Sequence, residues 1–185
     1  MHTALTSRRA LTDGSFAGLA AGMNYTAPAR TYYRDGHWTA QALLYADPDS
    51  VRAQIALLAK GIHSDGEAPS AVITADAAGM QIWDDFRLSH PDETAAHRHM
   101  GEWWSDHTDS PLFFILTLAD YCAFTGDTAL FKSYKPQVDA VFHRYAQMAS
   151  NGDGLPVKPR HDRDWADNVF RSGYVSYIAG LWMCA

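Results

Sequence analysis

Cysteine is scarce in this chain, which contains only Cys122 and Cys184 among its 185 residues. Two cysteines cannot form the disulfide framework of a small secreted domain, and both occur in apolar stretches typical of helices. We therefore expect buried, unpaired thiols and a cytoplasmic protein. Residues 1–20 lack a continuous apolar stretch, so we expect no signal peptide. The longest apolar run, near residues 111–118, is too short to cross a bilayer, and we expect no membrane partner.

Basic residues are also in the minority. The chain has 15 Lys and Arg against 21 Asp and Glu, which gives a formal net charge of −6, and no basic stripe occurs. This balance argues against nucleic acid as a partner. Because 47% of the residues are hydrophobic and 19% are charged, the chain can bury a real core and is not of the disordered class.

Aromatic residues, in contrast, are plentiful: they make up 12% of the chain, with six Trp and nine Tyr. One interpretation is an aromatic-rich core. The other is a sugar-binding site, because flat aromatic faces pack against the apolar faces of pyranose rings. Composition alone favours neither.

The spacing of apolar residues predicts a mainly helical chain. Asp47 and Pro48 form a helix-start signal for a helix to about residue 62. Sustained alternation of apolar and polar residues is missing, so we predict no sheet. Residues 64–107 are polar and predict one long loop, which in a compact domain is usually either functional or disordered. The other predicted helices cover residues 37–45, 111–124, 128–149 and 169–182.

Two consecutive predicted helices differ in character. Residues 111–124 are apolar on all sides, which indicates a helix buried on every face. Residues 128–149 are amphipathic, with an apolar stripe that includes Val138, either Val141 or Phe142, and Tyr145. An inner ring of helices wrapped by an outer ring produces this alternation, and so does an ordinary helical bundle.

Three clusters carry chemical groups, and the first precedes a predicted helix. Residues 32–38 read Tyr-Tyr-Arg-Asp-Gly-His-Trp. A fixed pair of Arg34 and Asp35, flanked by rings such as Trp38, can bind neighbouring sugar hydroxyls, because the carboxylate accepts and the guanidinium donates hydrogen bonds. The alternative is a structural ion pair at a helix start.

The second cluster leads into the apolar helix. Trp103 and Trp104 are followed by Asp106, His107 and Asp109. Asp109 precedes Ser-Pro at the expected helix start, so its simplest role is an N-cap. Asp106 and His107 have no such role and are candidates for lining a pocket.

The third cluster, residues 160–168, holds three aspartates, two arginines and a histidine around Trp165. Acid catalysis of glycosidic cleavage needs one carboxyl group that stays protonated near neutral pH. Packing against Trp165 and the proximity of a second carboxylate both raise a carboxyl pKa, through desolvation and like charge. Asp164 and Asp167 are the two candidates, whereas a solvated charge run is the simpler alternative.

The order of these clusters resembles the six-hairpin glycosidases, a clan that includes glucoamylases, glycogen-debranching amylo-α-1,6-glucosidases, trehalases and α-L-rhamnosidases. The resemblance covers roughly residues 25–185. It implies an all-α fold, a partial (α/α)6 toroid of helical hairpins, with the site in the loops at its mouth. It also implies inverting hydrolysis of oligo- or polysaccharides, α-glucoside-like, without metal or cofactor.

The resemblance also assigns roles. Arg34 and Asp35 bind the non-reducing sugar. Asp167 is the general acid, with Asp164 as the second choice. From the residues, Trp38, Trp103, Trp104, Asp106, His107 and Trp165 complete the expected pocket.

Length sets the chain apart from a complete toroid. Twelve helices of about 12 residues each, joined by loops of about 5 residues, require more than about 200 residues. We therefore expect residues 1–185 to be the N-terminal part of a catalytic domain that lacks its general base, with little or no hydrolase activity alone. Its exposed apolar face favours self-association or association with the remaining half.

Two other classes stay open. A non-catalytic carbohydrate-binding domain would keep the aromatic residues without needing a carboxyl of raised pKa. A metal protein would use His90, His97, His99 and His107, although their spacing fits no regular helical ligand pair.

Overall fold

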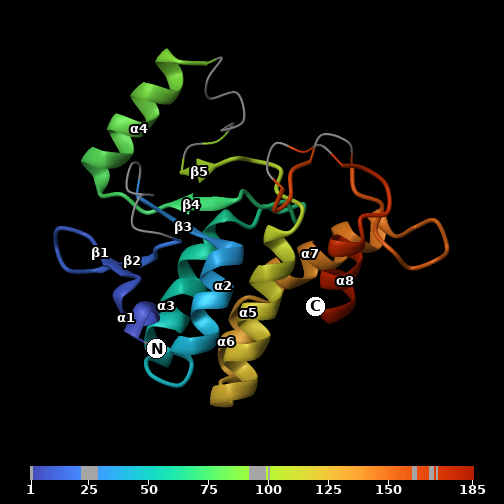
Figure 1. Cartoon of the computed structure of the whole chain (residues 1–185), viewed down its shortest axis with the longest axis horizontal. Coiled ribbons are helices and arrows are strands. Elements are labelled where there is room, and N and C mark those ends of the chain that lie inside the picture. The colour runs from blue at the N-terminus through green and yellow to red at the C-terminus, as the bar shows by residue number, and fades with distance from the viewer. Residues whose placement is uncertain are drawn as a thin grey trace.

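The computed structural model describes residues 2–21, 29–91, 99, 101–159, 162–166, 169 and 171–185. Two small sheets and a layer of helices make up the described part of the chain (Figure 1). The helical elements are α1 (His2–Thr6), α2 (Tyr33–Leu43), α3 (Pro48–Leu58), η1 (Ala59–Gly61), α4 (Ala77–Ser89), α5 (Ser110–Thr125), α6 (Thr128–Ser133), α7 (Lys135–Met148) and α8 (Ser176–Cys184). The strands are β1 (Arg8–Ala10), β2 (Phe16–Leu19), β3 (Arg30–Tyr32), β4 (Ala71–Ile73) and β5 (Glu102–Trp103).

The prediction of an all-α fold, a partial (α/α)6 toroid, is wrong. Helices account for 53% of the described residues, and the strands form two antiparallel sheets in the orders β1–β2 and β3–β4–β5. Strands of two to four residues are too short to show alternation between two faces. In addition, every residue of β3 and β4 is buried, so neither strand has a polar face to reveal it.

The main core lies where α2, α3 and α5 pack side by side (Figure 1). Leu43 of α2, Ile55 of α3 and Leu112 of α5 are completely buried there. The first half of α5 is buried on nearly all sides, as its apolar sequence predicts, while its last turn is exposed. Removal of apolar surface from water at this junction holds the three helices together.

The predicted start of α3 is confirmed. The Asp47 carboxylate accepts from the Ser50 backbone N–H at 3.2 Å, and Pro48 occupies the first helical position. The helix then tightens into η1, which ends at Gly61. The N-cap and the proline therefore fix this helix from local sequence alone.

The helix predicted over residues 128–149 is two helices, α6 and α7, that meet at Tyr134. Pro136 has no backbone N–H to donate, so a continuous helix cannot pass through it. The apolar stripe is otherwise confirmed in α7, where Val138, Val141 and Tyr145 are buried and Phe142 is exposed.

The segment predicted as one long loop contains β4, α4 and β5. Strand β4 lies between β3 and β5, so residues 64–107 complete a sheet instead of forming a loop. Helix α4 stands apart from the main helical layer (Figure 1). Its Trp83 is buried against Trp103 of β5, with ring centroids 5.3 Å apart.

The last helix, α8, starts at Ser176, later than the predicted residue 169. Cys122 and Cys184 are both unpaired, as expected, but only Cys122 is partly covered and Cys184 is exposed. In the described part of the chain, no helix has the length and apolar character that crossing a membrane requires.

Candidate functional site

A hollow of about 570 Å³ opens between α2, α5, α8 and the loop before α8. Three of its lining residues, Arg34, Trp38 and Trp165, were predicted as site residues from two separate sequence clusters. A volume of this size lies within the usual range of small-molecule sites, about 300–1,000 Å³. Its described lining consists of Arg34, Trp38, Phe113, Trp165, Arg171, Tyr177 and Leu181.

Helix α2 places Arg34 and Trp38 together. The helix begins at Tyr33, so both residues lie in its first turns, four positions apart and therefore on one face. Trp38 is 64% exposed, and its ring edge contacts Phe113 of α5 at a centroid distance of 6.2 Å. The indole therefore has an anchored edge and leaves a broad face open.

Trp165 forms the facing wall. It is 50% exposed, and it contacts the ring of Tyr177 edge-on at 6.3 Å between centroids. The Arg171 guanidinium lies 5.4 Å from the Trp165 ring centroid, a cation–π contact that helps to hold the indole in place. Two exposed indoles on opposite elements thus border the hollow.

Asp109 is the buried anion beneath this hollow. Its carboxylate is almost fully shielded from solvent and binds three partners. Oδ2 accepts from Arg34 at 3.2 Å and from the Tyr177 hydroxyl at 2.8 Å, while Oδ1 lies 2.6 Å from His107 Nδ1. A single carboxylate therefore ties α2, α8 and the loop before α5 to one another.

The partners of Asp109 fix its charge. Burial acts to raise the pKa of Asp109, but His107 and Arg34 outweigh burial, and the net pKa lies below the usual Asp value. Burial and the adjacent Asp109 carboxylate raise the pKa of the Tyr177 hydroxyl. Asp109 is thus an anion that orients Arg34 and Tyr177 in the hollow.

The predicted N-cap role of Asp109 is wrong. Its side chain makes no capping hydrogen bond to α5. The residue precedes Ser-Pro as a cap would, but its partners Arg34 and Tyr177 are 75 and 68 positions away. Such long-range partners leave no mark in local sequence.

Asp164 supports the hollow from behind. Its side chain is completely buried, and Oδ1 accepts from Arg171 at 2.6 Å and from the Ala166 backbone N–H at 2.9 Å. The Lys158 ammonium lies 4.0 Å from Oδ2. Asp164 thereby shapes the turn that carries Trp165 and positions Arg171.

The loops of the second and third clusters pair with each other. His107 and Arg163 form a parallel β-bridge, and the Arg163 N–H donates to the Asp106 carbonyl at 2.9 Å. Asp106 has a φ of 61° and Trp104 one of 51°, a conformation that costs energy for residues other than glycine. His107 is buried and binds the Asp109 carboxylate. Neither His107 nor Asp106 belongs to the described lining of the hollow.

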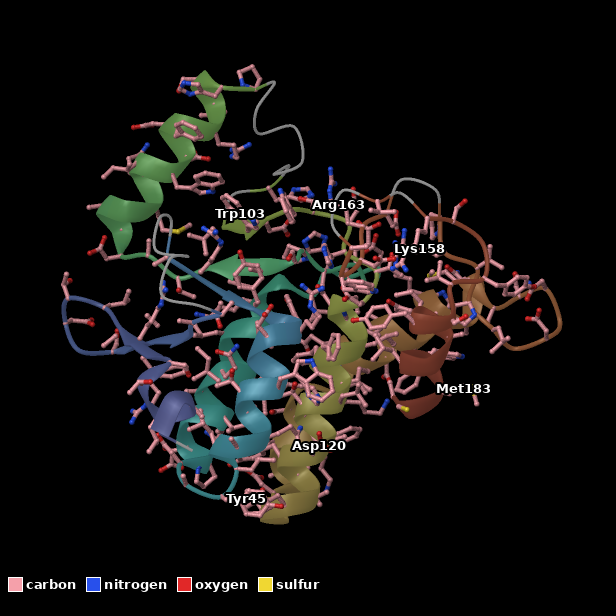
Figure 2. The ribbon with its side chains drawn as sticks, in the orientation of Figure 1. Tyr45, Trp103, Asp120, Lys158, Arg163 and Met183 are labelled. Atoms are coloured by element: carbon pink, nitrogen blue, oxygen red, sulfur yellow. The ribbon has the colours of Figure 1, made fainter. Side chains whose placement is uncertain are left out.

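Trp103 and Trp104 belong to a different part of the molecule. The Arg30 guanidinium lies 3.8 Å from the Trp103 ring centroid, and Trp83 packs on the same ring. Figure 2 shows Trp103 beside β5 and below α4, apart from the loop that carries Arg163 and Lys158. The structure does not bring either tryptophan to the described wall of the hollow.

The remaining predicted acids have different positions. Asp35 lies in the first turn of α2, where its carboxylate is 4.0 Å from the Arg34 guanidinium and 39% exposed, so the pair is looser than the Arg34–Asp109 pair. Asp167 lies outside the described residues. Asp162, which the sequence did not single out, is partly buried, and desolvation raises its pKa despite the nearby Arg144.

The histidines of the metal hypothesis are not gathered at one place among the described residues. His90 ends α4 and stacks on Phe86, whereas His107 binds Asp109. His97 lies outside the described residues. His99 is close to a different histidine, His63, with ring centroids 5.2 Å apart.

Comparison of the chain with protein-family models, with characterised proteins and with solved structures gave no match.

Proposed function

We propose that this chain forms part of a glycoside hydrolase and that the hollow between α2, α5 and α8 holds a sugar ring. One observation carries this proposal: Arg34, Trp38 and Trp165, selected from sequence as sugar-binding residues, line one hollow of about 570 Å³. Two exposed indoles supply flat apolar faces for a pyranose, and a guanidinium supplies hydrogen-bond donors for its hydroxyls.

Binding and orientation follow from this arrangement. Arg34 is held by Asp109, so its guanidinium is oriented before a sugar arrives, and less conformational entropy is lost on binding. Asp35 adds an exposed acceptor next to Arg34 at the start of α2. Arg171, fixed by Asp164, provides a second cation at the opposite wall.

In the proposed reaction Asp167 protonates the glycosidic oxygen, and a carboxylate outside residues 1–185 activates water on the other face. The two carboxyl groups of an inverting enzyme stand about 6.5–9.5 Å apart to admit that water. Asp167 is preferred to Asp164 as the acid because the Asp164 side chain is completely buried and Oδ1 is already hydrogen-bonded to Arg171 and Ala166. We also propose a cytoplasmic location, supported by the two unpaired cysteines.

A non-catalytic carbohydrate-binding domain is the second candidate. It is favoured by one observation: among the described residues that line the hollow, none is a carboxylic acid. Both candidates predict sugar binding, and they differ in whether Asp167 has a chemical role.

The test is a glycosidase assay on the longer protein that the proposal requires, with Asp167→Asn and Asp164→Asn compared. Loss of a general acid lowers kcat by about 10²–10⁴-fold. We expect this loss for Asp167→Asn with alkyl glycosides and a smaller loss with aryl glycosides whose leaving group needs no proton. Full activity of Asp167→Asn on alkyl glycosides, with sugar binding retained, would exclude the catalytic assignment. Residues 1–185 alone are expected to bind without hydrolysis.

A further inference from the structure

A second group of polar side chains gathers where the loop after η1 meets β5. It borders an open hollow of about 800 Å³ that shares no described lining residue with the sugar hollow. His63 Nε2 and the Glu102 carboxylate are hydrogen-bonded, and the His99 ring lies edge-on to His63. One donor atom from each of these three residues lies within 4.8 Å of the others.

We propose that His63, His99 and Glu102 form a binding site for a divalent transition-metal ion of the zinc type. Two imidazole nitrogens and one carboxylate oxygen are the protein ligands of many four-coordinate zinc sites, in which water occupies the fourth position. Zinc–nitrogen bonds of about 2.0–2.1 Å in a tetrahedral site separate the ligand atoms by about 3.3 Å. All three donor atoms lie within 4.8 Å of one another, and the hydrogen-bonded pair His63 and Glu102 would have to move apart slightly to reach this value.

Glu102 is prepared as a ligand. The residue is 5% exposed, and Ser105 Oγ donates to Oε2 at 2.9 Å, which leaves Oε1 directed at His63. A hydrogen bond to the second carboxylate oxygen is the usual way in which proteins orient a metal-binding carboxylate. His63, on the opposite side, is held in a tight turn in which its backbone N–H donates to the Glu67 carbonyl at 2.8 Å.

His99 can join the metal site without a large rearrangement of the protein. It is exposed, and the turn it begins is closed by the Glu102 N–H, which donates to the His99 carbonyl at 3.3 Å. An exposed imidazole can rotate toward a metal ion without disturbing the core. The metal would then connect the loop after η1 to β5.

A competing set, His63 with Asp65 and Glu67, also has donor atoms within 4.8 Å. Its carboxylates already have an ion-pair partner, because Arg144 lies 2.8 Å from Glu67 and 4.0 Å from Asp65. Binding a cation there would require loss of these ion pairs. Among the described residues, no arginine pairs with Glu102, so the geometry favours the set with Glu102.

The experiment uses the full 185-residue chain without an affinity tag, titrated with Zn²⁺ by calorimetry and with Co²⁺ by visible absorption. The expected result is one ion per chain and the d–d absorption of a four- or five-coordinate cobalt ion. His63→Ala, His99→Ala and Glu102→Gln each weaken binding at least tenfold. Far-UV circular dichroism checks that every variant is folded.

Two variants serve as matched controls. His143→Ala removes an exposed histidine on α7, and Asp65→Asn removes a carboxylate of the competing set. Both are expected to bind Zn²⁺ within twofold of the parent chain. The proposal is overturned if the parent chain binds no ion, if His99→Ala and Glu102→Gln bind normally, or if Asp65→Asn loses the ion. None of these outcomes bears on sugar binding.

Discussion

Asp109→Asn is expected to destabilise the protein strongly, because it removes the buried anion that joins three elements. The variant keeps the shape of the side chain but leaves the Arg34 guanidinium without its closest counter-charge. Removing one partner of a buried ion pair costs about 3–5 kcal/mol. Since the Arg34 side chain is 26% exposed, water recovers part of this energy, and the lower end, about 3 kcal/mol, applies. A domain is stable by only about 5–15 kcal/mol, so the effect is large.

The same variant should show a defined pH dependence. The pKa of Asp109 in the folded protein lies below the reference value of 3.8. Its contribution is therefore fully present above pH 3.8 and is lost as the pH falls through the lower folded value. The difference in free energy of unfolding between the parent protein and Asp109→Asn should therefore narrow as the pH falls below about 4.

Urea unfolding followed by far-UV circular dichroism measures this difference. Asp120→Asn, on α5, is the control: Asp120 is only partly buried and accepts one hydrogen bond from Gln41. It should cost no more than about 1 kcal/mol. A cost below about 1 kcal/mol for Asp109→Asn at pH 7 would refute the assignment of Asp109 as the buried anchor. So would a difference that does not change down to pH 3.

Two further predictions concern local structure. Gly66 has a φ of +83°, and an added Cβ would lie 2.4 Å from the Ala140 carbonyl oxygen. At Gly152, φ is also positive, but no atom lies within 4 Å of an added Cβ. Gly66→Ala should therefore lower the melting temperature far more than Gly152→Ala. Equal losses in thermal unfolding would show that the contact with Ala140 is unimportant. Asp47→Ala removes the cap of α3 and should cost about 1 kcal/mol in urea unfolding. Asp49→Ala, in the first turn of the same helix, should cost less, and the reverse order would contradict the capping assignment.

The helices could be predicted where local signals were strong. Asp47 and Pro48 define the start of α3, and the apolar run of α5 defines its burial. The break between α6 and α7 was also predictable, because Pro136 interrupts the helical pattern.

The sheet could not be predicted in the same way. Arg30↔Ile73 and Ala71↔Trp103 pair residues that are 43 and 32 positions apart. Every residue of β3 and β4 is buried, so their sequences do not alternate between polar and apolar residues. Tertiary context therefore decided the fold class that the sequence patterns missed.

The site shows the same division. Arg34, Trp38 and Trp165 were selected from the sequence by residue type, and the structure brings these three residues to one hollow. Asp109 and Arg171 were missed, since their roles depend on partners brought close by folding. A carboxylate with a plausible local role, such as an N-cap, conceals a long-range one.

The most direct test of the proposed sugar site is a titration of the isotope-labelled chain with D-glucose and with maltose, followed by the indole N–H resonances of its tryptophans. Trp38 and Trp165 line the hollow, whereas Trp83 and Trp103 pack against each other elsewhere. We predict that the indole resonances of Trp38 and Trp165 shift with one common saturation curve. The resonances of Trp83 and Trp103 should not shift. If no indole responds to either sugar, or if Trp83 and Trp103 respond instead, the hollow is not the sugar site.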